Sequence, residues 1–215
     1  MPTHGQETEA KFYIQDLDKI AARLQGLEAR LIQARVLETN IRFDLPNGQL
    51  VSERRVLRLR HDSESRLTYK SASINDQGVL SRTEIEFIVQ DFEKAKQFLQ
   101  ALGYQSIFYY EKYRRTFAIQ SSEGSIHIML DELPYGNFVE IEGETVDSIR
   151  QAADVLNLDW DTTIATSYFA LFRRARKALD FSFRDLTFEN FANIRVTPAH
   201  LEVRPADERA SPATR

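Results

Sequence analysis

Several short segments of this chain alternate charged and apolar residues, and this alternation limits the fold more than any other feature. The segments "ETEAK", "RTEIEF" and "VEIEGE" carry a charged residue at every second position. Basic segments, "RVLRLR", "RLTYK" and "EKYRR", follow the same pattern. Because successive side chains of a β-strand point to opposite faces, each segment is predicted to be a strand with one charged and one apolar face.

The composition of the charged faces indicates more than contact with water. An antiparallel sheet with one solvated face also alternates polar and apolar residues, and structural ion pairs look the same in sequence, so both ordinary interpretations stay open. A solvated face would accept Thr, Ser, Gln and Asn as readily as Arg and Glu. The segments mostly use Arg, Lys and Glu, which favours an interior lined with charge.

The chain also contains an internal repeat. The segment "TEAKFYIQDLDKIAARLQGL" at residues 8–27 lies over "TEIEFIVQDFEKAKQFLQAL" at residues 83–102, 75 positions further on. Apolar residues recur at helical spacing in the second half of each copy, so each copy is predicted to be a strand followed by a helix. Asp16 and Asp91 are the predicted helix N-caps, and Gly103 is the predicted end of the second helix.

Further strands are predicted at residues 36–45, 56–60, 66–71, 108–119, 125–130 and 138–142, and further helices at 145–156 and 162–179. Turn residues such as Pro, Asn and Gly separate the strands. About eight strands and four helices predict an α+β fold, in which an antiparallel β-barrel is closed or nearly closed and helices pack outside it.

Composition restricts the ligand. The 215 residues suffice for one large domain or a domain with an appendage, and 42% are hydrophobic, enough for a core. The net charge of -4 gives no general attraction for nucleic acid, so the basic strands are a local site for a small anion. The chain has no cysteine, which excludes disulfides, thiolate metal sites and a cysteine nucleophile. The N-terminal segment has no apolar run, so we expect a cytoplasmic protein without a membrane partner.

A barrel of about eight strands has room for side chains and one small ligand. Charges buried there without a ligand would lose several kcal/mol of hydration each. Arg and Lys bind phosphate oxygens, and Mg²⁺ joins protein carboxylates to substrate phosphates, so a metal and a polyphosphate are the expected ligands. The side chains expected to face the interior are Glu7, Glu9, Lys11, Arg58, Arg60, Lys70, Glu84, Glu86, Lys112, Arg114, Glu140 and Glu142.

The order of these charged strands resembles that of the CYTH superfamily, the triphosphate tunnel metalloenzymes. The resemblance covers residues 5 to about 173. Within the family, "LGYQSIFYYEKYRR", "IHIMLDELPYGNFVEIEG" and "TSYFALF" look most like class IV adenylyl cyclases and their bacterial relatives. The matching positions are Glu7-x-Glu9-x-Lys11, Arg58-x-Arg60, Lys70, Glu84-x-Glu86, Lys112-x-Arg114 and Glu140-x-Glu142.

The resemblance implies an eight-stranded antiparallel tunnel that holds a triphosphate with one or two Mg²⁺ or Mn²⁺ ions. Glu84 and Glu86 would complete its acidic wall, either as metal ligands or as partners that orient the basic residues. The implied metal ligands are Glu7, Glu9, Glu140 and Glu142, with Asp131 as an additional ligand. The implied phosphate-binding residues are Lys11, Arg58, Arg60, Lys70, Lys112 and Arg114.

Three residues are predicted to act in catalysis: Lys11, Lys112 and Arg42. In many relatives a tyrosine stands on the strand equivalent to "NIRFD" and assists the N-terminal lysine. This chain has Arg42 at that place, which argues against a lysine and a tyrosine acting together as the general base. Arg42 is instead expected to bind a substrate phosphate.

The implied function is a metal-dependent reaction on a triphosphate. In a class IV adenylyl cyclase-like reaction, ATP gives cyclic AMP and pyrophosphate. In a hydrolase, water attacks the terminal phosphorus of ATP, tripolyphosphate or thiamine triphosphate. A noncatalytic module that binds nucleotide or polyphosphate is the remaining alternative.

The resemblance divides the chain into a tunnel domain at residues 1–178 and an extension at 179–215. The aromatic segment "DFSFRDLTFENFANI" is predicted to pack on the barrel or on a second subunit of a homodimer, and residues 204–215 are predicted to be disordered. The basic run at Arg173, Arg174, Arg176 and Lys177 reads most simply as a solvated helix end.

Overall fold

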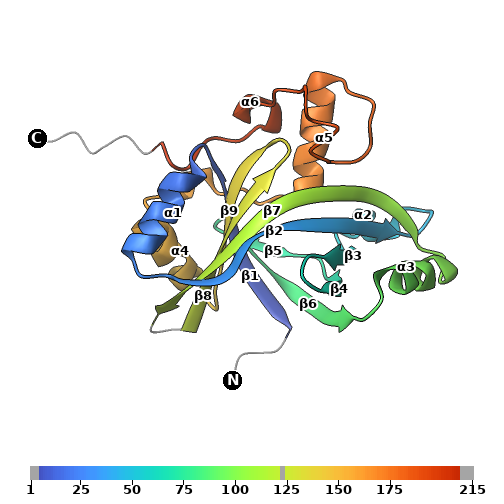
Figure 1. Ribbon diagram of the computed structural model, residues 1–215, viewed down its shortest axis with the longest axis horizontal. Helices are drawn as coiled ribbons and strands as arrows, with labels where there is room; N and C mark the ends of the chain where they lie inside the picture. The colour runs from blue at the N-terminus through green and yellow to red at the C-terminus, as the bar shows by residue number, and fades with distance from the viewer. Residues whose placement is uncertain (1–4, 122–123, 209–215) are drawn as a thin grey trace, which may run out of the picture.

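The computed structural model describes residues 5–121 and 124–208 (Figure 1). One large sheet and its flanking helices make up this part of the chain. The elements in chain order are β1 (Gln6–Ile14), α1 (Leu17–Gly26), β2 (Arg30–Asp44), α2 (Gln49–Ser52), β3 (Val56–His61), β4 (Ser65–Lys70), β5 (Ile74–Asp76), β6 (Val79–Val89), α3 (Phe92–Ala101), β7 (Gln105–Ser121), β8 (Gly124–Leu133), β9 (Gly136–Glu142), α4 (Val146–Val155), the 3-10 helix η1 (Trp160–Thr162), α5 (Tyr168–Leu179) and α6 (Pro198–Leu201).

Eight of the strands form a closed antiparallel ring, which confirms the predicted barrel. The strand order is β1-β9-β8-β7-β2-β3-β4-β6, and a pairing between β1 and β6 closes the ring. This closing contact is short, running from Gln6 opposite Thr83 to Glu9 opposite Leu80. In the described residues a ninth strand, β5, pairs with β6 outside the ring.

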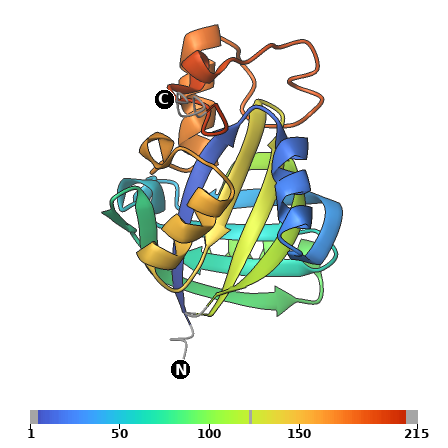
Figure 2. The ribbon, with the colours of Figure 1, turned by 90° about the vertical axis from the view of Figure 1, so that its left-hand side faces the viewer.

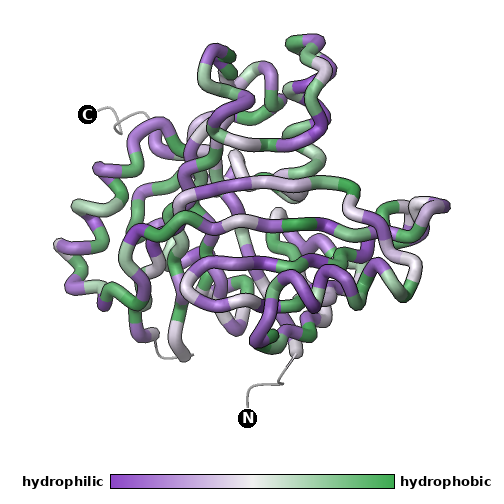
Figure 3. The backbone as a smooth tube through the Cα atoms, turned by 45° about the vertical axis from the view of Figure 1, so that its right-hand side comes forward, coloured by the Kyte–Doolittle hydropathy of each residue, from purple (hydrophilic) through white to green (hydrophobic). Residues whose placement is uncertain are grey.

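The alternating residues of β1 and β9 point to opposite sides of the ring, with charged side chains inside and apolar side chains outside. Figure 3 shows hydrophilic and hydrophobic residues alternating along the strands. On β1, Glu9 and Lys11 stand opposite Glu142 and Glu140 of β9, and these four side chains face the interior of the ring. Phe12 lies on the other face of β1 and is fully buried in the core outside the ring.

The internal repeat is a repeat of structure. The segment β1–α1–β2 recurs as β6–α3–β7, with both helices ten residues long. Asp16 accepts a hydrogen bond from the Lys19 backbone N–H at 3.1 Å, and Asp91 accepts one from Lys94 at 3.0 Å. Both predicted N-caps are therefore confirmed. Gly103, with φ of 92°, follows α3 in the left-handed region that favours glycine.

Helices cover the outside of the ring unevenly. Figure 2 shows α1 and α4 lying over β1, β8 and β9. In contrast, α3 packs through Leu99 against the apolar faces of β2 and β3. The outer face of β6 stays open, with Ile85 and Phe87 exposed. Helices therefore pack outside the ring, as predicted, but leave the apolar face of β6 uncovered.

The predicted helix at 162–179 begins later, at Tyr168. Two contacts explain the difference. The Ile164 backbone N–H donates to the Lys11 carbonyl at 2.8 Å, which holds the preceding segment against β1. The Ser167 hydroxyl accepts from the Ala170 N–H at 3.3 Å and caps the helix there. Residues 163–167 thus form a loop at the end of the ring.

The segment after α5 packs on the barrel. Phe181, Phe183 and Phe191 surround Phe172 of α5. The chain then returns to β1, where the Ala206 N–H donates to the Tyr13 carbonyl at 2.9 Å. The prediction of disorder from residue 204 is therefore wrong for residues 204–208, and residues 209–215 lie outside the described part. No helix in the described residues is long and apolar enough to cross a membrane.

Candidate active site

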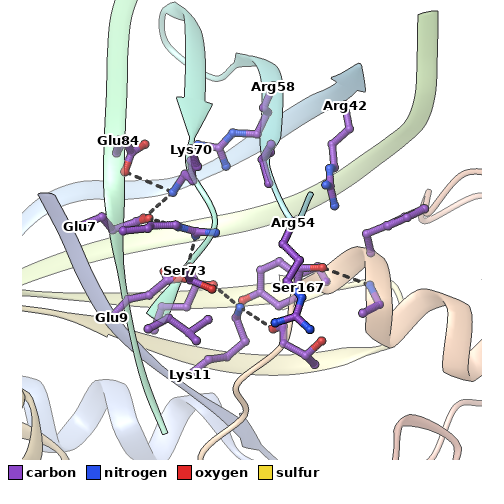
Figure 4. A pocket seen from close by; sticks show the side chains of 18 of the residues that line it. Glu7, Glu9, Lys11, Arg42, Arg54, Arg58, Lys70, Ser73, Glu84 and Ser167 are labelled. Atoms are coloured by element: carbon purple, nitrogen blue, oxygen red, sulfur yellow. Dashed lines mark hydrogen bonds and ion pairs between the residues drawn. The ribbon is translucent and has the colours of Figure 1, made fainter. Parts of the chain in front are cut away.

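A cavity of about 790 Å³ occupies the interior of the ring and is shown in Figure 4. Of the described residues, eleven Lys and Arg but only six Glu side chains line it. This excess of positive charge contrasts with the net charge of -4 of the whole chain. The predicted site residues that line the cavity are Glu7, Glu9, Lys11, Arg42, Arg58, Arg60, Lys70, Glu84, Glu86, Lys112, Arg114, Glu140 and Glu142.

Glu7 of β1 is the centre of one charged cluster. It accepts hydrogen bonds from the Lys70 ammonium and, at 2.7 Å, from Arg82 Nε. Lys70 also pairs with Glu84 at 3.2 Å, and Arg82 Nη2 donates to Glu9 at 3.1 Å. Burial opposes ionisation of Glu7, but Lys70 and Arg82 outweigh burial and lower its pKa to about 2. The Glu7 carboxylate is thus fixed in its charged form.

Glu9 and Glu142 stand opposite each other and experience a different field. Burial raises the pKa of Glu9, and the neighbouring carboxylates of Glu7 and Glu140 raise it further. Burial, followed by Glu7 and Glu9, raises the pKa of Glu142 to about 7. Glu142 has no hydrogen bond or ion pair within the described residues. Carboxylates that converge and repel one another in this way are suited to bind a divalent cation.

Lys11 lies between the acidic strands and α5. Its ammonium group is 3.1 Å from Glu140, 3.3 Å from the Thr166 carbonyl oxygen and 4.3 Å from the centre of the Tyr168 ring. Burial opposes its charge, but Glu140 and then Glu9 outweigh burial and raise its pKa above the ordinary lysine value. Lys11 therefore stays protonated, which suits a phosphate clamp and not a general base.

Asp131 does not reach the cavity. It is fully buried, and its carboxylate accepts from Lys112 at 3.0 Å, from Arg114 Nε at 2.6 Å and from the Tyr168 hydroxyl at 2.9 Å. Because cations and a hydroxyl already occupy both oxygens, the geometry argues against the predicted role of metal ligand. Asp131 instead orients Lys112 and Arg114 toward the cavity.

Glu38, like Asp131, is a buried carboxylate that pairs with Lys112 and orients it. It is buried, with Lys112 at 3.5 Å and Arg60 at 3.8 Å. Burial opposes its ionisation, but Lys112 and then Arg114 hold its pKa well below the usual range. Glu38 and Asp131 thus fix a charged Lys112 between them.

Arg42 points into the cavity, as its strand register predicted. It is only 9% exposed, and its buried Nε has no hydrogen-bond partner. The guanidinium carbon lies 5.0 Å from the Phe169 ring centre. Burial lowers the Arg42 pKa, Tyr110 counteracts it, and the nearby Arg58 lowers it further. Arg42 is thus a poorly compensated cation in the cavity wall.

Other residues of the cavity or its wall are not among those predicted from the sequence. Arg82 shares strand parity with Glu84, and Glu38 shares it with Arg42, so the alternation could have identified both. Tyr168 and Arg173 of α5 and Arg54 after α2 come from segments without alternation, and only the fold brings them to the cavity or its wall. Of the basic run at the end of α5, Arg173 alone lines the cavity, whereas the neighbouring Arg174 pairs with Glu202 at 3.3 Å.

The donor set fits a divalent cation, although the carboxylates are turned toward basic neighbours. Within residues 5–121 and 124–208, no group of three or more His, Asp or Glu side chains is already arranged around one point. Glu7 faces Lys70 and Arg82, and Glu140 faces Lys11 and Arg114. The raised pKa values of Glu9 and Glu142 nevertheless identify two carboxylates that a cation would stabilise.

Comparison with known proteins agrees with the predicted resemblance. A Methanocaldococcus jannaschii protein named "Putative adenylate cyclase MJ0240" is 27% identical over 175 residues, which are 77% of this chain and 97% of the relative. The structure of a "putative adenylate cyclase" from Vibrio parahaemolyticus has a TM-score of 0.66 at 20% identity and covers 76% of this chain and 96% of its own.

A Hippeastrum protein, described as a "putative adenylyl cyclase" that reveals a dominant triphosphatase activity, has a TM-score of 0.58 at 19% identity and covers 78% of this chain and 95% of its own. Because both structures are less than 25% identical to this chain, the similarity shows a shared fold and nothing more. The family model described as the CYTH domain matches residues 5–167. This match spans most of the chain, and the fold and the order of the charged strands agree with it. The chain therefore belongs to the CYTH domain family.

Proposed function

We propose that this chain is a metal-dependent enzyme that hydrolyses a triphosphate inside the tunnel. The observation that carries the proposal is the excess of Lys and Arg over Glu around a closed interior. Such an excess would destabilise the fold unless a polyanion entered, because buried cations without counterions lose their hydration. The CYTH family consists generally of enzymes that use divalent metal ions and act on triphosphates.

The basic wall would hold the phosphates. Arg58, Arg60 and Lys112 present donors into the cavity from β3 and β7. Arg60 is held by Glu86 at 3.0 Å, and Lys112 by Asp131 at 3.0 Å, so both are oriented before the substrate arrives. Phosphoryl transfer depends mainly on alignment and on neutralising charge in the transition state. A rigid array of cations supplies both.

The acidic wall would hold Mg²⁺ or Mn²⁺. Glu9 and Glu142 are the first choice because burial and neighbouring carboxylates raise their pKa values, so that a bound cation would stabilise their charged forms. Glu7 and Glu140 would join them after giving up a basic partner to the substrate phosphates. When bound, the metal would act as a Lewis acid and neutralise negative charge on the substrate.

Lys11 and Arg42 support phosphoryl transfer to water in which no lysine acts as the general base. Lys11 stays protonated beside Glu140, so it stabilises negative charge on the substrate and does not take a proton. Arg42 replaces the expected tyrosine and adds a cation at the opposite end of the clamp. Both residues would therefore contribute electrostatic stabilisation in the hydrolysis.

A cyclase is the second candidate. The name of the Methanocaldococcus jannaschii relative, which covers most of this chain, favours it. In that reaction the same cations would hold ATP, while the ribose 3′-hydroxyl would take the place of water as the attacking group. The wall residues serve either reaction, and the position of the attacking oxygen decides between them.

Product analysis tests these candidates. Purified protein with Mg²⁺ or Mn²⁺ should release orthophosphate from tripolyphosphate, ATP or thiamine triphosphate. Cyclic AMP and pyrophosphate from ATP would identify a cyclase instead, and no turnover of any substrate would leave a binding module. Arg58→Ala should weaken tripolyphosphate binding, whereas Arg66→Ala on the neighbouring strand, outside the cavity, should not.

A further inference from the structure

Three arginines line the cavity from three separate elements. Arg42 comes from β2, Arg54 from the turn after α2, and Arg173 from α5. In Figure 4, Arg42 lies across the pocket from Glu7 and Glu84, and Arg54 reaches toward Ser167.

The three arginines differ from the other cations of the site in their partners. Lys11 pairs with Glu140, and Arg82 pairs with Glu7. Within the described residues, Arg42, Arg54 and Arg173 form no ion pair with Asp or Glu. The cavity thus has three lining cations without a carboxylate partner among the described residues.

Arg42 makes this point most clearly because it cannot rely on water. Its side chain is nine-tenths buried, and its Nε is buried without a partner. Asp44 is on the same strand, but its oxygens accept backbone hydrogen bonds from Leu45, Leu50 and Val51 at 2.7–2.9 Å. A buried guanidinium without an anion is costly, so the missing counterion is expected to come with the ligand.

We propose that Arg42, Arg54 and Arg173 bind a further phosphate, so that the preferred ligand is a linear polyphosphate of four or more phosphates. The proposal rests on the proposed function, in which Arg58, Arg60 and Lys112 hold the first three phosphates. The cavity of about 790 Å³ is in the range of pockets for drug-sized ligands, so a bare triphosphate leaves part of it empty. A neutral base there would leave the buried Arg42 uncompensated, whereas another phosphate would supply its counterion.

The fourth phosphate can belong to inorganic tetrapolyphosphate or to adenosine 5′-tetraphosphate, which share this chemistry. The test compares two pairs of ligands: tripolyphosphate with tetrapolyphosphate, and ATP with adenosine tetraphosphate. Isothermal titration calorimetry in buffer with EDTA measures each dissociation constant without turnover. A preference in the inorganic pair alone identifies inorganic polyphosphate as the ligand, and a preference in both pairs identifies the phosphate itself.

The variant is Arg54→Asn combined with Arg173→Gln, which leaves Arg42 in place. Arg54 has φ of 57°, a conformation that Asn adopts more readily than most residues, and Arg173 is exposed, so the fold should be retained. The matched control, Arg176→Gln with Lys177→Gln, removes the same charge from exposed positions of α5 outside the cavity.

The wild type and the control should bind tetrapolyphosphate about tenfold more tightly than tripolyphosphate. In the variant the two constants should agree within about twofold, while tripolyphosphate affinity changes by less than about threefold. Equal constants in the wild type, or a ratio that survives in the variant, would overturn the subsite and leave the proposed function standing. A wild type that binds neither polyphosphate in EDTA and hydrolyses neither with Mg²⁺ would overturn the proposed function as well.

Discussion

In the first repeat, α1 buries Leu17, Ile20 and Leu24 against the sheet, whereas in the second repeat α3 buries Leu99 and leaves Phe98 exposed. The helices have the same length and the same type of cap. Their sequences therefore specify the same local structure in both places. The amount of surface that each helix covers depends on the rest of the fold.

The strands of the two repeats differ even more. Phe12 of β1 and Phe87 of β6 are equivalent positions, but Phe12 is 0% exposed and Phe87 is 54% exposed. Trp160, whose ring centre lies 6.0 Å from that of Phe12, and α4 cover the first position. Both come from the part of the chain after the second repeat. A local pattern thus predicts an element, while distant residues decide whether its apolar face is buried.

The largest expected effect is on the free energy of unfolding. Phe12→Ala should destabilise the protein by about 3–5 kcal/mol because it leaves a cavity in the core. The matched change Phe87→Ala should cost less than about 0.5 kcal/mol, since that side chain already contacts water. Urea unfolding of the two variants measures both values. Equal losses would show that another surface covers β6 in solution, as a homodimer would.

The second effect is on activity and concerns Glu9 and its counterpart Glu84. Glu9→Gln should lower kcat/KM at limiting Mg²⁺ by about a hundredfold, because it removes a carboxylate from the proposed metal site. Glu84→Gln should lower it by about tenfold or less, since Glu84 mainly pairs with Lys70. Steady-state kinetics at several Mg²⁺ concentrations separates the two. If the two variants lose kcat/KM to a similar extent, both Glu9 and Glu84 contribute to the metal site, and the site is not confined to the first repeat.

The third effect is a pH dependence that originates at Glu142 of β9, the strand paired with β1 of the first repeat. Glu142 keeps its proton up to about pH 7 in the fold, but a carboxyl group in the unfolded chain releases it near 4.5. Between these values the folded state binds more protons, so the stability of the metal-free protein should fall as pH rises from 4.5 to 7. Denaturation in EDTA across this range measures the slope, and Glu142→Gln should reduce it. An unchanged slope in that variant would contradict the assignment.

The smallest effect should be the same in both repeats. Asp16→Ala and Asp91→Ala each remove one N-cap hydrogen bond, and each should cost about 1 kcal/mol of stability. Asn at either position should restore most of the loss, because its side-chain oxygen accepts the same bond. Thermal unfolding of the four variants tests whether the two helices are equivalent locally. A difference of more than about 1 kcal/mol between the alanine variants would show that the surroundings also act on the caps.

The sequence allowed the barrel and most of its charged lining to be predicted, because strand alternation reports directly which side chains share a face. It did not reveal the role of Asp131, which has the parity of a lining residue. That role depends on Tyr168, from a helix distant in sequence. Arg54 and Arg173 could not be predicted for the same reason, since no periodicity links a turn or a helix to the tunnel.

The closure of the ring has a consequence for synthesis of the chain. β1 is made first, but its long partner β9 ends at Glu142, and its neighbour β6 contributes only the short contact from Leu80 to Thr83. Contacts this distant in sequence form slowly. A nascent chain that stops before β9 therefore has open edges on β1 and β8, and open edges favour pairing with other chains. Because β9 pairs with both β1 and β8, the edges of these two strands stay open to other chains until β9 has been synthesised.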